Sequence, residues 1–332
     1  MTGVLITGAG SVMGQSTFRA LDLHDFGETK VEVHFANSER IAAGRHFRSE
    51  NMVVAGLPIF PLATDENYLA VVEEYVEAHS IGIVYAGTQH ELMKLAEYRD
   101  RTGKAATLGV RAASLCVDKG HTNAVLRDFG LETPNDQVLM SWLSAPAFQG
   151  DVIVKPRTSS ASRSITRIRG GVNNEKAVNE LVAAIGSERT GEYVVQSLLE
   201  GDEYTCGCYV DRYSGDVSVI VLRRTLTADG ATLFGEVIFD EEIDRYVRGC
   251  ARALQKHGLE YGHINVQLIK TNHGPVAFEI NGRLSSTERP KAVLGFNSTA
   301  AYFENIVHCR PYRFDKMRQE GRFIRYYDEI YF

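Results

Sequence analysis

Several patterns that would assign a protein to a class are absent from this chain of 332 residues. Its five cysteines include no C-x-x-C pair, and its ten histidines follow no metal-ligand spacing, which excludes the common zinc and redox motifs. Cys206 and Cys208 form a C-x-C in a strand-like stretch, so their side chains should point to one face. We therefore expect buried free thiols in a reducing compartment.

Long hydrophobic runs and a strong charge of one sign are also missing. The longest apolar runs, such as VSVIVL at 217–222, have the length of a strand and are too short to span a bilayer. The first run, VLIT, is too short for a signal peptide and has no basic residue before it. A net charge of −6 gives no sign of a nucleic-acid-binding face. We expect a soluble, cytoplasmic protein that binds neither nucleic acid nor membrane.

The chain is long enough for two or three domains, and its patterns divide it into three parts. Residues 1–112 alternate strand-like and helical segments, which indicates a parallel sheet covered on both faces. Residues 113–190 have shorter segments, typical of a small α+β unit. Residues 191–332 begin with EYVVQSLL and continue with long runs that look antiparallel, interrupted by a helix at 240–257. The expected fold class is therefore α/β combined with α+β.

The first chemical candidate is the glycine-rich turn in GVLITGAGSVMG, close to the amino terminus. Gly8, Gly10 and Gly14 are spaced G-x-G-x-x-x-G, one residue longer than the dinucleotide-binding fingerprint. The acidic residue that would close the second strand of such a site is missing, since that strand leads into Asn37. We interpret the glycines mainly as a tight strand-to-helix turn. An NAD-dependent nucleotide-sugar enzyme that uses this turn is the less favoured alternative.

The second candidate is the segment DVIVKPRTSSASRSI at 151–165. Lys155 ends a buried strand, where an ammonium group needs an anionic partner. The serines and arginines that follow, Ser160 and Ser162 among them, can donate hydrogen bonds to phosphate. A polar hairpin turn with Lys155 in a surface ion pair explains this stretch equally well.

The third candidate is the hairpin that ends in FEINGR. Glu279 and Asn281 lie two residues apart on a strand, so their oxygens project to one face, and Gln267 on the preceding strand can pair alongside them. One carboxylate with one or two amide oxygens suits Mg²⁺ that substrate phosphates also hold. Arg283 adds a cation beside this cluster. Alone the pattern is weak, because E-x-N occurs in many strands.

The fourth candidate is VVQSLLEGDEY at 194–204. A strand that contains Gln196 and continues through Leu199 to Glu203 can form a hinge against adenine. Backbone groups would then read the edge of the base, and the carboxylate would hold the ribose hydroxyls. Without that context the stretch is only a strand, a turn and another strand.

Together these stretches resemble the ATP-grasp superfamily, in particular the branch like the large subunit of carbamoyl-phosphate synthetase. VLITGAGSVMGQS resembles that branch's leading segment, YAGTQHELMKLAEYRDR its strand and helix with a T-x-x-E-L pattern, and DKGHTNAVLRDFGLETP the start of its lid. The likeness covers nearly the whole chain in order. It implies a Rossmann-like pre-ATP-grasp domain (1–112), a lid subdomain (113–190) and an antiparallel-sheet subdomain (191–332).

The same resemblance implies roles for individual residues. ATP contacts are implied for Lys119, Lys155, Ser160, Ser162, Gln196, Leu199 and Glu203, with Gln196 and Leu199 at the adenine and Glu203 at the ribose. The implied metal ligands are Gln267, Glu279 and Asn281, and the implied catalytic cations are Arg283, which steadies the transferring phosphate, and Lys155. For the acceptor we expect contacts from Arg224, Glu91 and Ser285.

The activity that the resemblance implies is ATP-dependent ligation of a carboxylate to an amine through an acyl phosphate, with Mg²⁺ or Mn²⁺. Its partners would be small-molecule carboxylates and amines, and its assembly a homodimer. The chain departs from the family pattern twice: the loop after Lys155 has no glycine, and the family's Asn-Pro-Arg reads Asn281-Gly282-Arg283. A catalytically impaired ATP-binding or regulatory relative is therefore an open alternative.

Overall fold

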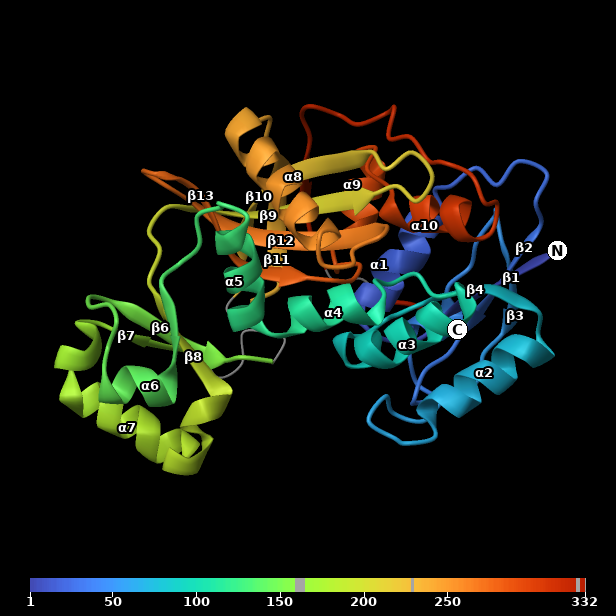
Figure 1. Ribbon diagram of the computed structural model, residues 1–332. Helices are drawn as coiled ribbons and strands as arrows, with labels where there is room; N and C mark the ends of the chain where they lie inside the picture. Colours follow the sequence, from blue (N-terminus) through green and yellow to red (C-terminus); the bar gives the residue numbers. More distant parts are fainter. Residues whose placement is uncertain (159–164, 228–229, 327–328, 332) are drawn as a thin grey trace.

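Three β-sheets organise the molecule. The computed structural model describes residues 1–158, 165–227, 230–326 and 329–331, which Figure 1 shows as a ribbon. They form a four-stranded parallel sheet, a small four-stranded sheet and a six-stranded antiparallel sheet. In Figure 1 the small sheet and the parallel sheet lie at opposite ends of the molecule. Within the described ranges, no helix is both long and apolar enough to cross a membrane.

The parallel sheet lies near the amino terminus and is covered on both faces, as the sequence predicts. Its strands, in order across the sheet, are β3 (Val53–Gly56), β2 (Val31–Phe35), β1 (Thr2–Ile6) and β4 (Ile81–Tyr85). On one face, helices α2 (Tyr68–Ala78) and α3 (Leu92–Thr102) pack against strand residues such as Leu5. On the other, α1 (Val12–Leu21) and α10 (Ser298–Ile306) pack against Val4 and Ile6. This is the Rossmann-like arrangement expected.

The small sheet is antiparallel and carries its own core. Its strands, in order across the sheet, are β5 (Asp136–Val138), β8 (Tyr193–Ser197), β6 (Val152–Pro156) and β7 (Thr166–Ile168). Helices α6 (Leu139–Ser144) and α7 (Glu175–Ile185) contribute to a core around the fully buried Trp142. This core is separate from the clusters in the rest of the protein.

Strand β8 corrects the boundary predicted at residue 190. The run EYVVQSLL was expected among the strands of the C-terminal part, but β8 pairs with β5 and β6 in the small sheet. Its Val195 is fully buried in the small core with Val154. Strand-like composition does not reveal which of two antiparallel sheets a strand joins, because that choice depends on long-range pairing. We therefore propose that the lid ends after Ser197.

The six-stranded sheet forms most of the C-terminal part. Its strands, in order, are β13 (Gly274–Asn281), β12 (Gly262–Thr271), β9 (Asp202–Val210), β10 (Val217–Leu226), β11 (Thr232–Val237) and β14 (Arg322–Ile324). The expected closing strand in the tail is confirmed for β14, which pairs with β11. One face packs against α4 (Val110–Val117), α5 (Lys119–Asp128) and α8 (Glu241–Gln255).

Helix α10 connects the large sheet to the parallel sheet. Its Ala301 and Tyr302 belong to one core cluster with Tyr209 of β9 and with Ile6 of β1. The hydroxyl of Tyr85 at the end of β4 donates to the carbonyl of Thr299 in α10 at 2.8 Å. The short helix α9 (Glu288–Val293) precedes it and packs against α1. The ends of β1 and β4 are thereby fixed relative to the large sheet.

The cysteines follow the sequence prediction with one exception. Cys206 and Cys208 both lie in the core between the large sheet and α8, and Cys116 and Cys250 are also buried free thiols. Burial raises the pKa of the Cys116 thiol to about 12. Cys309, in contrast, is exposed.

Candidate functional site

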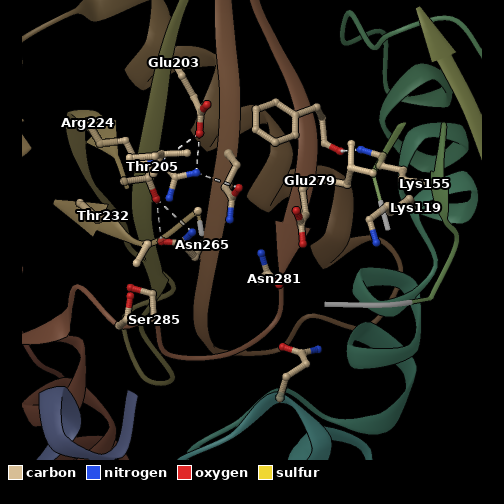
Figure 2. Close-up of a pocket in the computed structure, with 18 of the residues that line it drawn as sticks. Lys119, Lys155, Glu203, Thr205, Arg224, Thr232, Asn265, Glu279, Asn281 and Ser285 are labelled. Carbon is tan, nitrogen blue, oxygen red and sulfur yellow. Dashed lines mark hydrogen bonds and ion pairs between the residues drawn. The ribbon is translucent and has the colours of Figure 1, made fainter. Parts of the chain in front are cut away.

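A pocket of about 720 Å³ lies where the three sheets meet. Its walls include Ser11 and Thr88 from the parallel-sheet domain, Lys155 from the small sheet and Glu279 from the large sheet. Figure 2 shows the side chains that line it. Its volume is in the range typical of sites for small molecules and cofactors.

The hairpin of β12 and β13 brings the predicted metal ligands together. Gln267 lies directly opposite Glu279, and Asn281 lies opposite Asn265, so the expected cross-hairpin pairing is confirmed. All four side chains line the pocket. Sequence reasoning missed Asn265, although it lies two residues before Gln267 and so should share its face. It also missed Thr205 on β9, whose hydroxyl hydrogen-bonds Asn265.

A β-bulge in this hairpin shapes the pocket wall. Gln267 pairs with Glu279, but the next residue of β12, Leu268, pairs with Ala277, so Phe278 is an extra residue in β13. Regular alternation would place consecutive residues on opposite faces of the sheet. At the bulge, both Phe278 and Glu279 line the pocket. The apolar ring and the carboxylate therefore occupy the same wall.

Lys155 and Lys119 enter the pocket from the lid side. Lys155 is only 5% exposed, and its ammonium donates to the Phe278 carbonyl at 3.0 Å. Burial lowers its pKa to about 8, with a smaller lowering by Lys119, while Glu279 opposes the shift. Burial also lowers the pKa of Lys119, the first residue of α5. Lys155 forms no ion pair with the described residues and is buried, so the surface ion pair considered for it is wrong.

Glu279 faces more positive charge than it can balance. Lys119, Lys155 and Arg283 all interact with its carboxylate electrostatically. Figure 2 shows Glu279 between the two lysines and Asn281. The described residues contain no cluster of three or more His, Cys, Asp or Glu side chains that would hold a metal alone. One carboxylate and one amide oxygen fit Mg²⁺, which takes its remaining ligands from phosphate and water.

Arg224 alters what was expected of Glu203 and Gln267. Its Nε donates to Glu203 Oε1 at 2.9 Å, and its Nη2 donates to Glu203 Oε1 at 2.5 Å and to Gln267 Oε1 at 3.0 Å. The amide oxygen of Gln267 is its only metal-binding atom, and in this arrangement a guanidinium lies next to it. A divalent cation there would be repelled, which leaves Glu279 and Asn281 as the better ligands.

The adenine-side candidates line an apolar part of the pocket. Leu199 and Gln196 are among its lining residues, together with Ile153, Leu198, Ile269 and Phe278. Gln196 is 1% exposed, and its Nε2 has no hydrogen-bond partner in the described part of the chain. An unpaired amide donor buried beside apolar walls is costly unless a ligand accepts from it. A purine edge fits this position.

Two of the residues expected to contact the acceptor, Glu91 and Ser285, form hydrogen bonds with other groups of the protein instead. Glu91 is not part of the pocket wall: its carboxylate accepts from the Tyr68 hydroxyl at 2.6 Å and from the amides of Gly87 and Thr88 at 3.0 and 2.8 Å. The expectation for Glu91 was wrong because a side chain in a capping box turns back towards the backbone. Ser285 does line the pocket, but its hydroxyl hydrogen-bonds Thr287 and Glu288. Ser160 and Ser162 lie outside the described residues.

The glycine-rich turn serves mainly to build the parallel-sheet domain. Gly8 has a φ of +51°, and a side chain at Gly14 would collide with the backbone of Gly8. The amide of Gly10 donates to Asn37 Oδ1 at 3.1 Å. Ser11 caps α1 and reaches the pocket wall. These contacts support the tight-turn interpretation over the dinucleotide site.

Residues 116–287, just over half of the 332-residue chain, match the ATP-grasp domain family. The chain belongs to the ATP-grasp family. The matched range contains Lys119, Lys155, Glu279, Asn281 and Arg283 and excludes Glu91. Both the predicted family and the predicted fold are confirmed.

The chain has low sequence identity to the individual proteins and solved structures that it resembles. A D-alanine–D-alanine ligase of Parabacteroides distasonis is 28% identical over 158 residues, 44% of this chain and 44% of that ligase, so the match spans less than half of the relative. An L-amino acid ligase from Bacillus licheniformis superimposes with a TM-score of 0.70 at 17% identity, covering 96% of this chain and 76% of that one. Biotin carboxylase from Campylobacter jejuni gives 0.71 at 13% identity, covering 97% and 74%. At these identities the two structures show a shared fold.

Proposed function

We propose that the protein is an ATP-dependent ligase that joins a small carboxylate to an amine and releases ADP and phosphate. The observation that carries the proposal is Lys155, a buried ammonium that, among the described residues, donates only to a carbonyl and lies opposite Glu279 and Asn281. Such a cation needs an anion, and the carboxylate and amide beside it suit the metal that accompanies a nucleotide. The match to the ATP-grasp family supports the same reading.

The side chains of the pocket position and neutralise rather than react. Lys119, Lys155 and Arg283 would balance the charge of the phosphates, and Glu279 and Asn281 would hold the magnesium ion, which supplies further charge stabilisation when bound. Gln196 would receive the edge of the adenine through its unpaired Nε2. Mn²⁺ fits the same oxygen ligands.

The reaction then needs no nucleophilic side chain. A substrate carboxylate oxygen attacks the γ-phosphorus, and the bond from that phosphorus to the bridging oxygen breaks, which releases ADP. The amine attacks the carbonyl carbon of the acyl phosphate, phosphate leaves, and the nitrogen loses a proton. Walls from three sheets surround the pocket, and closure around bound substrates would exclude water from the acyl phosphate.

Calorimetry of nucleotide binding tests the first half of this proposal. We expect Lys155→Ala and Glu279→Ala to weaken binding of magnesium and a non-hydrolysable ATP analogue by at least roughly tenfold, since each removes a charge-assisted contact. Lys270→Ala is the matched control, because Lys270 lies on β12 and pairs with Asp240 at the surface. Wild-type affinity in both site variants would contradict the proposal.

Isotope transfer tests the second half. Carboxylates labelled with ¹⁸O would be incubated with ATP and candidate amines. Amino acids come first, because two of the similar proteins are a D-alanine–D-alanine ligase and an L-amino acid ligase. Transfer of ¹⁸O from the carboxylate to released phosphate is expected if an acyl phosphate forms. Tight ATP binding without ADP release under any pairing would favour the regulatory alternative.

The NAD-dependent alternative is tested in the same titrations. The Gly10 amide is already bound by Asn37, and the second strand ends without the acidic side chain that would hold the ribose. We expect no measurable binding of nicotinamide cofactors. Binding of NADH that survives Lys155→Ala would instead place a dinucleotide at the glycine-rich turn.

A further inference from the structure

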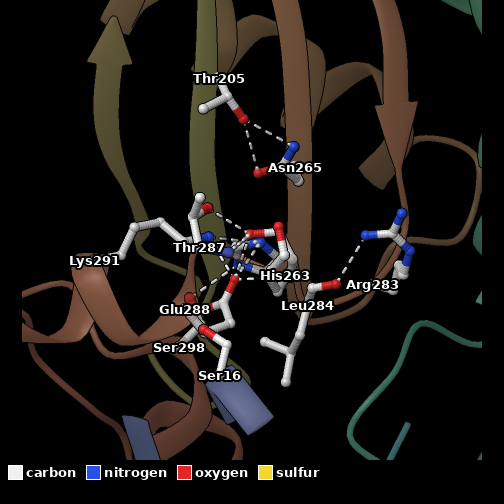
Figure 3. A network of polar contacts seen from close by, with 12 residues as sticks. Ser16, Thr205, His263, Asn265, Arg283, Leu284, Thr287, Glu288, Lys291 and Ser298 are labelled. Carbon is white, nitrogen blue, oxygen red and sulfur yellow. Dashed lines mark hydrogen bonds and ion pairs between the residues drawn. The ribbon is translucent and has the colours of Figure 1, made fainter. Parts of the chain in front are cut away.

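Arg283 is held in place by a residue of the parallel-sheet domain. Its Nε donates to Gln89 Oε1, and its Nη1 donates to the carbonyl of Leu284 at 3.0 Å. Figure 3 shows the second of these bonds. Both Arg283 and Gln89 line the pocket. In the described ranges no hydrogen bond or ion pair engages Nη2, so this end of the guanidinium is available to a ligand.

The position of Gln89 is itself fixed by the turn that carries it. Gln89–Glu91 form a single 3-10 turn that follows β4. Thr88 and Glu91 close a capping box around it, and Glu91 also accepts from the hydroxyl of Tyr68 in α2. Glu91 is only 4% exposed. The T-x-x-E pattern of the sequence therefore locks the backbone of Gln89 to the core of the parallel-sheet domain.

The chemistry of an amide suits this position. The Gln89 oxygen accepts one N–H and fixes the plane of the guanidinium, but it carries no charge and leaves the positive charge of Arg283 intact. A carboxylate at residue 89 would form an ion pair and compete with phosphate for the arginine. Burial lowers the pKa of Arg283, opposed by Glu279 and Glu288, and no carboxylate of the described residues lies within ion-pair distance of it.

We propose that Gln89 is a positioning residue for phosphoryl transfer. It aims the guanidinium of Arg283 at the terminal phosphate of the bound nucleotide, so the parallel-sheet domain supplies part of the geometry of the transfer site. The assignment rests on the proposed function of the pocket. It accounts for the T-x-x-E pattern, whose glutamate does not reach the pocket.

The test compares two nucleotides in wild-type protein and in Gln89→Met, which keeps the length of the side chain but removes the acceptor. We expect affinity for a non-hydrolysable ATP analogue with magnesium to fall roughly ten- to 150-fold, the range for a hydrogen bond to a charged group. Affinity for ADP with magnesium should change by less than twofold, because ADP lacks the phosphate that Arg283 reaches. Gln15→Met is the matched control, since Gln15 lies in the same domain and outside the pocket.

A double-mutant cycle separates positioning from a general structural role. In an Arg283→Ala background, Gln89→Met should have no further effect on the ATP analogue. An equal loss for both nucleotides, or an additive loss in the double variant, would overturn the assignment. Gln89→Glu is a second variant that keeps the acceptor and should also weaken the ATP analogue selectively, by cancelling the charge. Thermal unfolding of each variant verifies that it is folded.

The two levels of the proposal fail in different ways. Wild-type protein that binds neither nucleotide overturns the proposed function, and this assignment with it. Wild-type protein that binds both, with the same ratio of affinities in Gln89→Met, overturns this assignment alone.

Discussion

Two buried lysines that contact the hairpin of β12 and β13 have opposite surroundings. Lys291 is fully buried, and its ammonium lies 2.5 Å from Glu288 Oε1 and 3.4 Å from His263 Nε2 (Figure 3). Lys155 is nearly as buried, but the one hydrogen bond of its ammonium to a described residue goes to the Phe278 carbonyl. The first cluster is closed by its own counter-charge, and the second is open towards a pocket. Burial of a lysine alone does not mark a ligand site; the missing anion does.

The cluster of Lys291, Glu288 and His263, called the closed cluster, holds a loop of the pocket wall in place. Burial lowers the pKa of His263 to about 3, so this imidazole is neutral at physiological pH, and Lys291 keeps the pKa of Glu288 below its usual value. Glu288 Oε1 also accepts from the backbone amide of Ser285 at 2.9 Å. Ser285 and Thr287 line the pocket. The ion pair thus fixes a loop of the site without entering it.

The largest effect should follow from opening the closed cluster. Lys291→Met leaves the Glu288 carboxylate buried without its counter-charge, and we expect the free energy of unfolding to fall by about 3–5 kcal/mol. Urea denaturation measures it. The double variant Lys291→Met/Glu288→Gln should recover most of the loss, because no charge is then left unpaired. A single variant within about 1 kcal/mol of wild type would show that the carboxylate tolerates isolation.

The same substitution at the open site should separate binding from stability. Lys155→Met is expected to leave the free energy of unfolding equal or slightly higher, because it removes a buried, unpaired ammonium. Nucleotide binding should weaken by about 1.5–3 kcal/mol. Denaturation and calorimetry on one preparation provide both numbers. Destabilisation as large as in Lys291→Met would mean that Lys155 stabilises the fold. The contrast between a stabilising Lys291 and a ligand-binding Lys155 would then be wrong.

A pH titration sharpens the comparison, since the pKa of Lys155 is lowered to about 8. As pH rises through that value the folded protein loses this proton, so affinity for the ATP analogue should fall about tenfold between pH 7 and 9. The unfolded chain keeps the proton up to about 10.4, so the same group makes stability rise with pH in that window. Lys155→Arg should flatten the affinity profile, leaving the smaller part due to Lys119, whose pKa is also lowered. A profile identical to that of wild type would exclude Lys155 as the source.

The smallest effect on the free energy of unfolding is expected at an ion pair that is neither fully buried nor open to the pocket without a counter-charge. Arg224 and Glu203 form an ion pair at the pocket edge, with side-chain exposures of 10% and 29%. Because solvent screens such a pair, Arg224→Met should lower the free energy of unfolding by less than about 1 kcal/mol. It also removes the guanidinium from Gln267, so the dependence of nucleotide affinity on magnesium concentration should shift to lower magnesium. An unchanged magnesium dependence would show that Gln267 does not ligate the ion even when its hydrogen bond with Arg224 is removed.

Local pattern predicted the parts of the site that lie along single elements. The two-residue spacing of Glu279 and Asn281 fixed their shared face, and the short hairpin brought Gln267 opposite Glu279. Contacts between distant elements could not be predicted in this way. The bond from Gln89 to Arg283 spans 194 residues, and the pair of Arg224 and Glu203 depends on the register of two strands.

Where sequence reasoning failed, a side chain or strand had more than one feasible partner. Glu91 was assigned to the acceptor because it follows a strand end, but the capping box of its own turn is a closer set of donors. The β8 run fits either antiparallel sheet equally well by composition. The burial of Lys291 could not be predicted, because the local sequence is the same whether a lysine on a short helix is exposed or faces a core.

The extra residue at Phe278 lets one strand present two neighbouring residues to the pocket, an apolar ring and the proposed metal ligand Glu279. A chain one residue shorter there would restore regular pairing and would keep Glu279 opposite Gln267. It would lose the ring on the pocket wall and the carbonyl that holds Lys155. Under the proposed function, such a protein would keep the proposed metal ligands Glu279 and Asn281 and would bind the nucleotide more weakly. A deletion of one residue would therefore separate the apolar wall of the pocket from the proposed metal ligands. A point substitution, in contrast, changes only one side chain.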